Sequence, residues 1–318
     1  MAEEIQNLNI ENIKNLVGIG TKIEDFEPIK SENQDFTLLG RDKFGYTEKM
    51  KSKLNNKIYA VQKMLVKREG FPRSLIRAIT IMIELNNEYI LKIYGYFQGN
   101  INLEKLKIIF KDNFNDLYQN ESNEKIMYYF ILEFVPNGSL DNYLNKCRGL
   151  KVEIPQEFVI KIFKQLLIAI NYLHSRQLIH NDIKLDTILL DENNNAKIKF
   201  NDISKLYRES SEENNLNSNL TLLGHRDIIA PEILNGMNFD FKVDVFSLGL
   251  TMLCLISKKY PILFTNSKRK IIFESIDENI YNENLINLIK KMIKENPMQR
   301  PNIGEALEEL YKIENVSV

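Results

Sequence analysis

The spacing of apolar residues changes along the chain from a strand-like to a helix-like period. Residues 36–64, FTLLGRDKFGYTEKMKSKLNNKIYAVQKM, alternate apolar and polar positions and are interrupted by glycines and an Asn-Asn pair. This pattern predicts three strands joined by a glycine turn and an Asn-Asn turn. Further strands are predicted over Tyr89–Phe97 and Met127–Phe134, and a helix over Ser74–Asn86, where apolar residues recur at helical spacing.

Helical spacing dominates the second part of the chain. Apolar side chains recur every three or four residues over Glu157–Leu173, and the same spacing returns over Asn284–Ile293 and Asn302–Leu310. Ser139 follows an Asn-Gly turn and is a favourable residue for the start of a helix. We therefore expect a strand-rich first part and a remainder that is helical.

The stretch Leu178–Tyr207 carries the candidate chemistry. It consists of an apolar pair, a polar loop HNDIKLDT, an apolar triplet, a DENNN turn and a short strand-like run AKIKF. This order predicts a loop, a hairpin and a second loop, which would bring two acidic loop segments close together.

The same stretch resembles the catalytic core of eukaryotic protein kinases. His180-Asn181-Asp182 stands where that family has H-R-D, and Lys184 stands at the catalytic-loop lysine. Thr187 stands at the metal-binding asparagine, and Phe200-Asn201-Asp202 at the D-F-G motif. The later matches are Ala230-Pro231-Glu232 at A-P-E, Asp244 at the helix aspartate that supports the catalytic loop, and Arg300 at the buried partner of Glu232.

The resemblance implies an α+β, bilobal protein-kinase-like fold over about residues 36–312. The small lobe, about 36–135, would be rich in strands with one main helix, and the large lobe, about 136–312, would be mostly helical. Residues 1–35 would form an N-terminal extension, either flexible or docked on the core, and residues 313–318 a C-terminal tail. About 101–123 is an insertion relative to the family, with apolar residues at helical spacing.

The groups with which the family holds a nucleotide are replaced. Asp42 stands at a glycine of the phosphate loop and adds a negative charge beside an anionic ligand. Gln62 replaces the lysine that contacts the phosphates, and Ala78 replaces the glutamate that pairs with this lysine. Losing both members of the pair avoids leaving one buried charge alone. The resemblance implies a degenerate nucleotide pocket formed by Gly40, Gly45, Ala60, Gln62, Leu132 and Leu189.

Substitutes for the missing groups remain open. Glu84 would serve as the helix glutamate if the helix is aligned differently, and Lys43 or Lys49 would supply the cation from another strand. Asp202 would bind metal if the hairpin is two residues longer. Lys63 directly follows the replaced lysine position, but successive side chains of a strand point to opposite faces, so it should point away.

The motifs that hold the kinase fold are present, and those that hold MgATP are replaced. Phosphoryl transfer depends on positioning and on neutralising the charge of phosphate oxygens. We therefore expect a pseudokinase that acts as a scaffold, an allosteric partner or a structural component. Asp182 and Lys184 are its residual catalytic residues, no metal site or cofactor is expected, and ATP would bind weakly or without metal at most. The alternative is an unconventional but active serine/threonine-type kinase that uses Asp182 as its base.

Composition narrows the class of partner. The 318 residues are 44% hydrophobic and 27% charged, and the net charge of −1 gives no case for nucleic acid or a membrane surface as partner. Two cysteines do not make a disulfide framework, the start is too polar for a signal peptide, and the longest apolar run, Phe246–Ile256, is too short to cross a bilayer. We expect a cytoplasmic protein, with the cytoskeleton as a candidate location. It would bind a protein partner or large assembly through residues 1–35 and 101–123.

Overall fold

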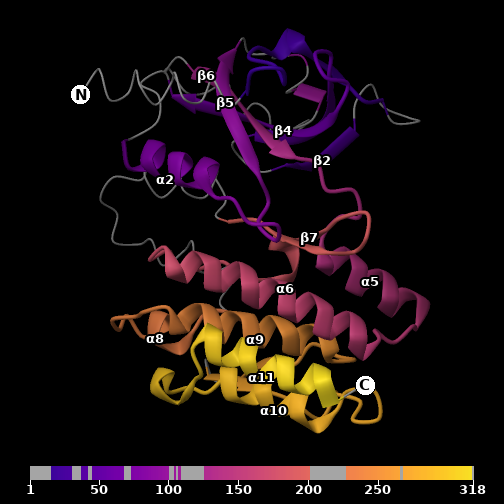
Figure 1. The fold of residues 1–318 in the computed structure, drawn as a ribbon, viewed down its shortest axis with the longest axis vertical. Coiled ribbons are helices and arrows are strands. Elements are labelled where there is room, and N and C mark those ends of the chain that lie inside the picture. The colour runs from indigo at the N-terminus through magenta and orange to yellow at the C-terminus, as the bar shows by residue number, and fades with distance from the viewer. Residues whose placement is uncertain are drawn as a thin grey trace. The chain divides into compact units, whose positions relative to one another are not determined.

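The structure is a computed structural model of the 318-residue chain. It describes residues 16–30, 37–41, 45–67, 73–99, 104, 107–108, 125–200, 227–265 and 268–316. These residues form two compact units, the first containing residues up to 86 and 92–134, and the second containing 87–91, 135–200 and the described residues from 227 onward. The first unit is a sheet with a helix and the second consists mainly of helices (Figure 1). The predicted α+β, two-lobed fold is confirmed.

A six-stranded antiparallel sheet forms the first unit. The strands run in the order β1-β3-β4-β6-β5, and β2 also pairs with β3. Their bounds are β1 Phe26–Pro28, β2 Thr37–Arg41, β3 Gly45–Ser52, β4 Ile58–Lys67, β5 Ile93–Gly99 and β6 Lys125–Glu133. The predicted series of three strands is confirmed by β2, β3 and β4, and Asn56 takes the left-handed conformation that turns favour, with φ of 61°.

The fifth strand begins later than predicted. The prediction placed a strand over Tyr89–Phe97, whereas β5 starts at Ile93. Residues 87–91 belong instead to the second unit, where Ile90 forms a bridge with Ile198. The apolar pattern is continuous across this point, so the sequence gives no sign of the change from one unit to the other.

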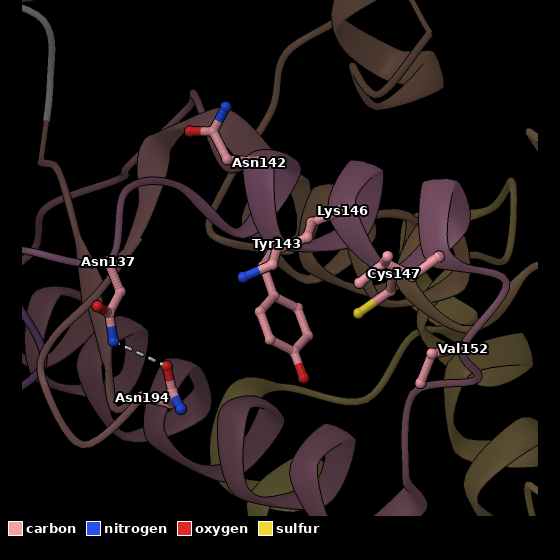
Figure 2. Close-up of a pocket in the computed structure, with 8 residues that line it drawn as sticks. Asn137, Asn142, Tyr143, Lys146, Cys147, Val152 and Asn194 are labelled. Atoms are coloured by element: carbon pink, nitrogen blue, oxygen red, sulfur yellow. Dashed lines mark hydrogen bonds between the residues drawn. The ribbon is translucent and has the colours of Figure 1, made fainter.

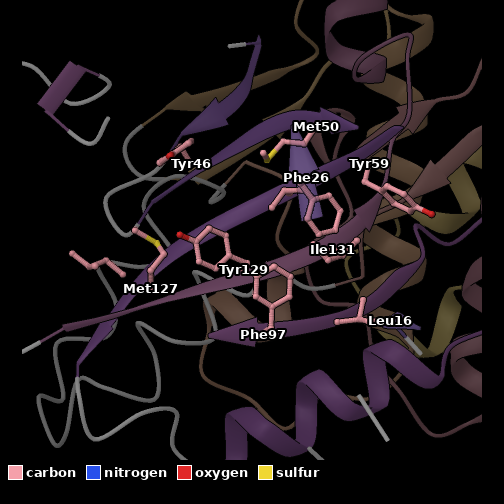
Figure 3. Packing of buried hydrophobic residues seen from close by; sticks show 11 residues of the cluster. Leu16, Phe26, Tyr46, Met50, Tyr59, Phe97, Met127, Tyr129 and Ile131 are labelled. Carbon is pink, nitrogen blue, oxygen red and sulfur yellow. The ribbon is translucent and has the colours of Figure 1, made fainter. Parts of the chain in front are cut away.

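One face of the sheet is covered by an apolar core that includes the N-terminal segment (Figure 3). Leu16 is 0% exposed and Phe26 is 4% exposed, and the Phe26 ring stacks on Phe97 with centroids 6.2 Å apart. Each side chain of this kind stabilises the fold by about 1.5–3 kcal/mol when fully buried. Residues 16–30, with η1 over Ile23–Asp25, therefore pack on the first unit, which agrees with the docked alternative predicted for the N-terminal extension.

A single helix completes the first unit. Helix α2, Arg73–Glu84, confirms the prediction over Ser74–Asn86 to within a few residues. Ile79, Met82 and Ile83 are buried at its helical spacing. It contacts β5, and this packing explains why the apolar stripe is continuous in the sequence.

Helices packed side by side make up most of the second unit (Figure 1). Helix α9 is buried at every position from Val243 to Ile256 and lies against α6 and α10, while α11 lies against α6 and α10. Ser139 caps α5 as predicted, because its Oγ accepts a hydrogen bond from the Asn142 N–H. The bounds are α5 Leu140–Leu150, α6 Gln156–Ser175, η3 Leu185–Thr187, β7 Ile188–Leu190, β8 Ala196–Ile198, α8 Pro231–Leu234, α9 Lys242–Ile256, α10 Glu283–Met292, η5 Pro297–Gln299 and α11 Ile303–Val316.

A hairpin interrupts the second unit where only helices were predicted. Strand β9, Ile262–Thr265, pairs with β10, Lys268–Ile271. The Tyr260 hydroxyl donates to the Asp227 carboxylate at 2.8 Å, and the Arg269 guanidinium donates to the Asp227 carbonyl at 3.1 Å. The prediction is wrong here because an apolar run this short does not distinguish a strand from a buried helix by spacing.

The last helix is longer than predicted. Ile313 is 4% exposed and continues the buried stripe of Ile303, Ala306 and Leu310. The tail expected from residue 313 is therefore wrong, because α11 extends to Val316. Among the helices that the structure describes, none has the length and apolar character needed to cross a membrane.

Several expectations concern residues outside the described ranges. They are Asp42 and Lys43 in the phosphate loop, Asn201 and Asp202 after Phe200, residues 1–15 and 31–35 of the N-terminal extension, and nearly all of the insertion at 101–123.

Candidate active site

The residues predicted for the site fall in both units. Asp182, Lys184 and Leu189 lie in the second unit. The pocket residues of the first unit are Gly40, Gly45, Ala60, Gln62 and Leu132. Each unit therefore holds one part of the expected site.

A buried aspartate holds the loop that carries Asp182. Asp244, in the first turn of α9, is 0% exposed, and its carboxylate accepts hydrogen bonds from the backbone N–H groups of His180 and Asn181, each at 2.8 Å. His174 Nε2 lies 2.8 Å from the same carboxylate. These bonds stabilise the left-handed conformation of Asn181, whose φ is 56°. The predicted support of this loop by Asp244 is confirmed.

Asp182 and Lys184, the predicted residual catalytic residues, lie together in this loop. Lys184 Nζ is 3.5 Å from Asp182 Oδ1 and 3.6 Å from Asp186 Oδ2. The side chains of Lys184 and Asp182 are 12% and 10% exposed. In this arrangement the Asp182 carboxylate could accept a proton and the Lys184 ammonium could contact a phosphate, which are the roles expected of the two residues.

Thr187 closes the same loop through its hydroxyl. Its Oγ1 lies 3.0 Å from the carbonyl oxygens of Asp182 and Lys184 and accepts a hydrogen bond from the Lys184 N–H at 3.2 Å. The hydroxyl has one proton to donate and two lone pairs. Its hydrogen-bonding capacity is therefore used largely by the backbone around it.

Phe200 stands at the position aligned with the metal-binding aspartate. It is 6% exposed, and its ring meets the His180 ring edge to face with centroids 5.7 Å apart and an interplanar angle of 75°. This geometry is favourable for two rings of a core. The position holds an apolar packing contact within the second unit.

The buried His180 ring is neutral. Its Nδ1 accepts a hydrogen bond from the Asp182 N–H at 3.2 Å, so the proton lies on Nε2. Burial lowers the pKa of His180, against the opposing effects of Asp244 and Asp182. In the unfolded chain this histidine binds a proton near pH 6.5, whereas in the folded protein its pKa is lower. Acidification below pH 6.5 therefore favours the unfolded state.

The donor atoms at the two aligned metal positions do not fit magnesium. Mg²⁺ requires oxygen ligands at about 2.0–2.1 Å, usually carboxylates and phosphates. The Phe200 side chain carries no oxygen, and the Thr187 hydroxyl is engaged in the loop. Across the part of the chain that the structure describes, no group of three or more His, Cys, Asp or Glu side chains could hold a metal ion.

Strand β4 turns its lysine away from the expected nucleotide face. Gln62 pairs across the sheet with Thr47 and Phe130, and Lys63 points to the opposite face, as predicted from the alternation of a strand. Lys63 Nζ lies 2.5 Å from Glu48 Oε2, with side-chain exposures of 6% and 0%.

This Lys63–Glu48 pair was missed by sequence reasoning. The aromatic rings of Tyr46 and Tyr129 lie next to this pair, with their centroids 5.3 and 5.8 Å from Lys63 Nζ. Glu48 occupies a buried position of β3 between Tyr46 and Met50, where the alternation calls for an apolar residue. A glutamate at a position where the strand pattern requires an apolar residue could have indicated that it pairs with a buried cation.

Two of the proposed substitutes fall in the described residues. Glu84 is the last residue of α2 and is exposed, whereas Ala78 is partly buried within the helix. Lys49 pairs with Ala60 and therefore shares the face of Gln62, with its Nζ 4.5 Å from the centre of the Phe134 ring. Along β3, Lys49 is four residues from Gly45, so their Cα atoms are about 13 Å apart at the rise of a strand.

The remaining pocket residues lie on strands as expected. Ala60 and Leu132 face each other across β4 and β6 and are 8% and 9% exposed. Leu189 lies in β7, is partly buried and bridges to Ser139. These are apolar packing positions within their own units.

Gly45 is required by a close approach of two strands, whereas Gly40 is not. A Cβ at Gly45 would overlap the Lys63 carbonyl oxygen, while a Cβ at Gly40 would meet nothing within 4 Å. We expect Gly45→Ala to lower the free energy of unfolding by about 1–3 kcal/mol, because overpacking forces the strands apart. Gly40→Ala should change it by less than about 0.5 kcal/mol. Urea denaturation of both variants tests this, and equal effects would contradict the steric explanation.

Glu232 and Arg300 form the predicted buried pair. Arg300 donates from Nη1 and Nη2 to the two oxygens of Glu232 at 2.6 and 2.9 Å. Glu232 lies in α8, directly after the Ala230-Pro231 pair, and Arg300 follows η5. This pair joins two distant segments of the second unit.

Comparison with known proteins gives the same assignment as the motifs. A family model described as "Protein kinase domain" matches residues 34–312. The chain is 26% identical over 280 residues to "Serine/threonine-protein kinase Nek6" of Oryza sativa subsp. japonica, covering 86% of this chain and 46% of that protein. It is 26% identical over 294 residues to "Aurora kinase A-B" of Xenopus laevis, covering 89% of this chain and 63% of that protein.

A third relative is "Probable serine/threonine-protein kinase nek2" of Dictyostelium discoideum, 25% identical over 279 residues, with 85% of this chain and 60% of that protein covered. The chain thus spans less than two thirds of the length of these curated relatives. Since the family match covers nearly all of the two units, the chain belongs to the eukaryotic protein kinase superfamily.

Proposed function

We propose that this chain is a pseudokinase: a kinase-fold protein impaired in phosphate transfer that acts as a scaffold, an allosteric partner or a structural component. The observation that carries the proposal is the packing of Phe200 against His180 at the position of the family's magnesium-binding aspartate. The Phe200 side chain is 6% exposed and carries no oxygen that could bind a metal ion.

The chemistry of phosphate transfer supports this proposal. The reaction leaves little covalent work to the protein and depends on charges that neutralise the phosphate oxygens. Removing one preorganised electrostatic group commonly costs about 2.7–4 kcal/mol in transition-state stabilisation. Here Gln62, Ala78 and Phe200 replace three such groups, and Lys63 is paired with Glu48 on the other face of the sheet.

An unconventional active serine/threonine-type kinase is the second candidate. It is favoured by the contact between Asp182 and Lys184, 3.5 Å apart, which keeps a base and a cation together in the loop. It is also favoured by the names of the relatives, which describe serine/threonine-protein kinases.

Nucleotide binding and turnover separate the two candidates. A ligand at 100 times its dissociation constant stabilises the folded state by about 2.7 kcal/mol. We expect the full chain to show no magnesium-dependent thermal shift with ATP, and a weak, metal-independent shift at most. With radiolabelled ATP, Mg²⁺ and mixed protein substrates, wild type and Asp182→Asn should transfer phosphate equally slowly. Transfer by wild type that disappears in Asp182→Asn would establish the second candidate.

We propose that the chain binds a protein partner in the cytoplasm. The insertion at 101–123 and the N-terminal residues are the proposed contacts with that partner. Leu16 and Phe26 are buried in the first unit, so deleting all of 1–35 would damage the core. Deleting 101–123 is the cleaner test: it should release a partner identified by crosslinking while the urea transition is kept. Undiminished association of that partner would refute the role of the insertion.

A further inference from the structure

The second unit contains a pocket that lies apart from the aligned catalytic residues. Its volume is about 400 Å³, within the range of ligand sites, and its walls come from α5, the segment after α5, and the turn between β7 and β8. None of Asp182, Lys184 or Leu189 lines it. An inference drawn from this pocket is therefore independent of whether the chain transfers phosphate.

Aromatic and aliphatic groups form most of the pocket's walls. The Tyr143 ring lies between the Asn137–Asn194 pair on one side and Cys147 and Val152 on the other (Figure 2). It stacks on Phe158 with centroids 4.7 Å apart, which fixes the ring. A fixed aromatic wall is suited to an apolar group and is available without reorganisation.

The Asn137 amide is held by the turn opposite α5, which also carries Asn194. Asn137 Nδ2 donates to the Asp191 carbonyl at 2.8 Å and to Asn194 Oδ1 at 3.0 Å. The Asp191 carboxylate accepts hydrogen bonds from the backbone N–H groups of Asn193 and Asn195 within the same turn. These hydrogen bonds hold this wall in place, and Asp191 is not among the residues that line the pocket.

The free charge at the α5 rim is positive. In the described part of the chain, the Nζ of Lys146 makes no hydrogen bond or ion pair, and neither does that of Lys151. Of the acids near this rim, Glu153 lies 3.5 Å from Lys258, and Asp141 accepts a hydrogen bond from Asn145 at 2.9 Å. On the opposite rim the exposed acid is Glu192 in the β7–β8 turn. A ligand with one carboxylate therefore finds its complement at Lys146.

The apolar surface extends beyond the cavity. Leu150 and Val152, both on the pocket wall, are 65% and 57% exposed. A small molecule held within the cavity would leave both in water, whereas a peptide that continues past the mouth would cover them. Exposed apolar groups beside a concave site are typical of surfaces that bind proteins.

We propose that this pocket binds a segment of a protein partner, with one large apolar side chain entering beside Tyr143 and a neighbouring carboxylate pairing with Lys146. Leu150 and Val152 cover the flanking backbone of that segment. The interaction belongs to this surface and differs from the contacts proposed for residues 1–35 and 101–123.

Cys147 gives a direct readout of occupancy. The chain has two cysteines, and the other, Cys254, is buried, which raises its pKa to about 12 and makes it a poor nucleophile. Cys147 is partly exposed and lines the pocket. Alkylation of the full chain by N-ethylmaleimide, followed by intact mass, therefore reports access to this pocket.

The probes are two peptides that differ by one charge, acetyl-Phe-Glu-amide and acetyl-Phe-Gln-amide. We expect both to slow the alkylation of Cys147 at roughly millimolar concentrations, as is usual for ligands of this size. The glutamate peptide should bind about threefold more tightly, the gain of one exposed ion pair. Lys146→Gln should remove this difference, and Val152→Glu should weaken the glutamate peptide. Both substituted side chains are exposed, so the urea transition should not change.

Three outcomes would overturn the proposal. They are alkylation that neither peptide slows, equal protection by the two peptides, and a preference for glutamate that persists in Lys146→Gln. Protection by both peptides, with a preference for glutamate that Lys146→Gln removes, would support it. None of these results depends on phosphate transfer, so they leave the test of the proposed function separate.

Discussion

Replacing Lys63 with methionine is expected to lower the free energy of unfolding by about 3–5 kcal/mol, because it leaves the Glu48 carboxylate buried without its cation. Lys63 Nζ lies 2.5 Å from Glu48 Oε2, and Glu48 is 0% exposed. The surroundings are of low polarity: burial raises the pKa of Tyr129 to about 12 and also raises that of Tyr46. Losing this cation is costly for a carboxylate in such a site.

The double variant Lys63→Met/Glu48→Leu tests whether the cost comes from the charge that is left buried. Replacing both members of a buried pair with apolar residues is often neutral or stabilising, so the double variant should regain most of the loss. The matched control is Lys51→Met in the neighbouring strand β3, because Lys51 lies 3.7 Å from Glu27 in a pair that is 39% and 51% exposed. This control should cost less than about 1 kcal/mol.

Urea denaturation, followed by tyrosine fluorescence and circular dichroism, measures these differences. If Lys63→Met costs no more than Lys51→Met, the pair is not the buried charge contact described. A double variant as unstable as Lys63→Met would show that the lysine acts through packing against the rings of Tyr46 and Tyr129 rather than through charge.

Arg300→Met is expected to destabilise the second unit by about 3–5 kcal/mol. Arg300 binds both oxygens of Glu232 and also donates to the carbonyls of Lys294, Lys242 and Glu295, at 2.7, 3.0 and 2.9 Å. Methionine keeps much of the apolar stem but removes every donor. The change therefore leaves a carboxylate and three carbonyls without this partner.

Lys291→Met is the control for this second prediction. Lys291 Nζ lies 2.7 Å from Glu309 Oε1, a comparable distance, but the side chains are 54% and 33% exposed. Its loss should cost less than about 1 kcal/mol. Arg300→Lys is a further test, because a lysine carries the charge but not the planar set of donors, so it should recover only a minor part of the stability. Similar stabilities of Arg300→Met and Lys291→Met in urea would contradict the role assigned to burial.

Both predictions concern charged pairs that are buried within one unit of this kinase-fold chain, but only the Glu232–Arg300 pair matches a family motif. Groups that hold the backbone, such as Asp244 and the Glu232–Arg300 pair, make the contacts that the motifs predict. At Phe200 the motif position is instead occupied by a side chain that adds to packing. The contacts that hold the backbone and the position aligned with the metal ligand therefore depend on different residues of this chain.

Many of the secondary-structure elements of this protein could be predicted from its sequence. The strands β2, β3 and β4, the helix α6 and the cap at Ser139 were predicted because each depends on neighbours close in the chain. The partners Asp244 and Arg300 were assigned by motif. The direction of Lys63 followed from the alternation of a strand, which is a property of the backbone.

Other features depend on contacts between segments distant in sequence. Leu16 is buried because the sheet presents an apolar face to it, and the β9–β10 hairpin is joined to Asp227 by Tyr260 and Arg269. The Lys63–Glu48 pair spans two strands, and the pocket beside Tyr143 combines a helix with a turn. Periodicity says which face of an element is apolar but not what will cover it. The free energy of burial and of charge pairing depends on that partner, and the folded arrangement of the chain supplies it.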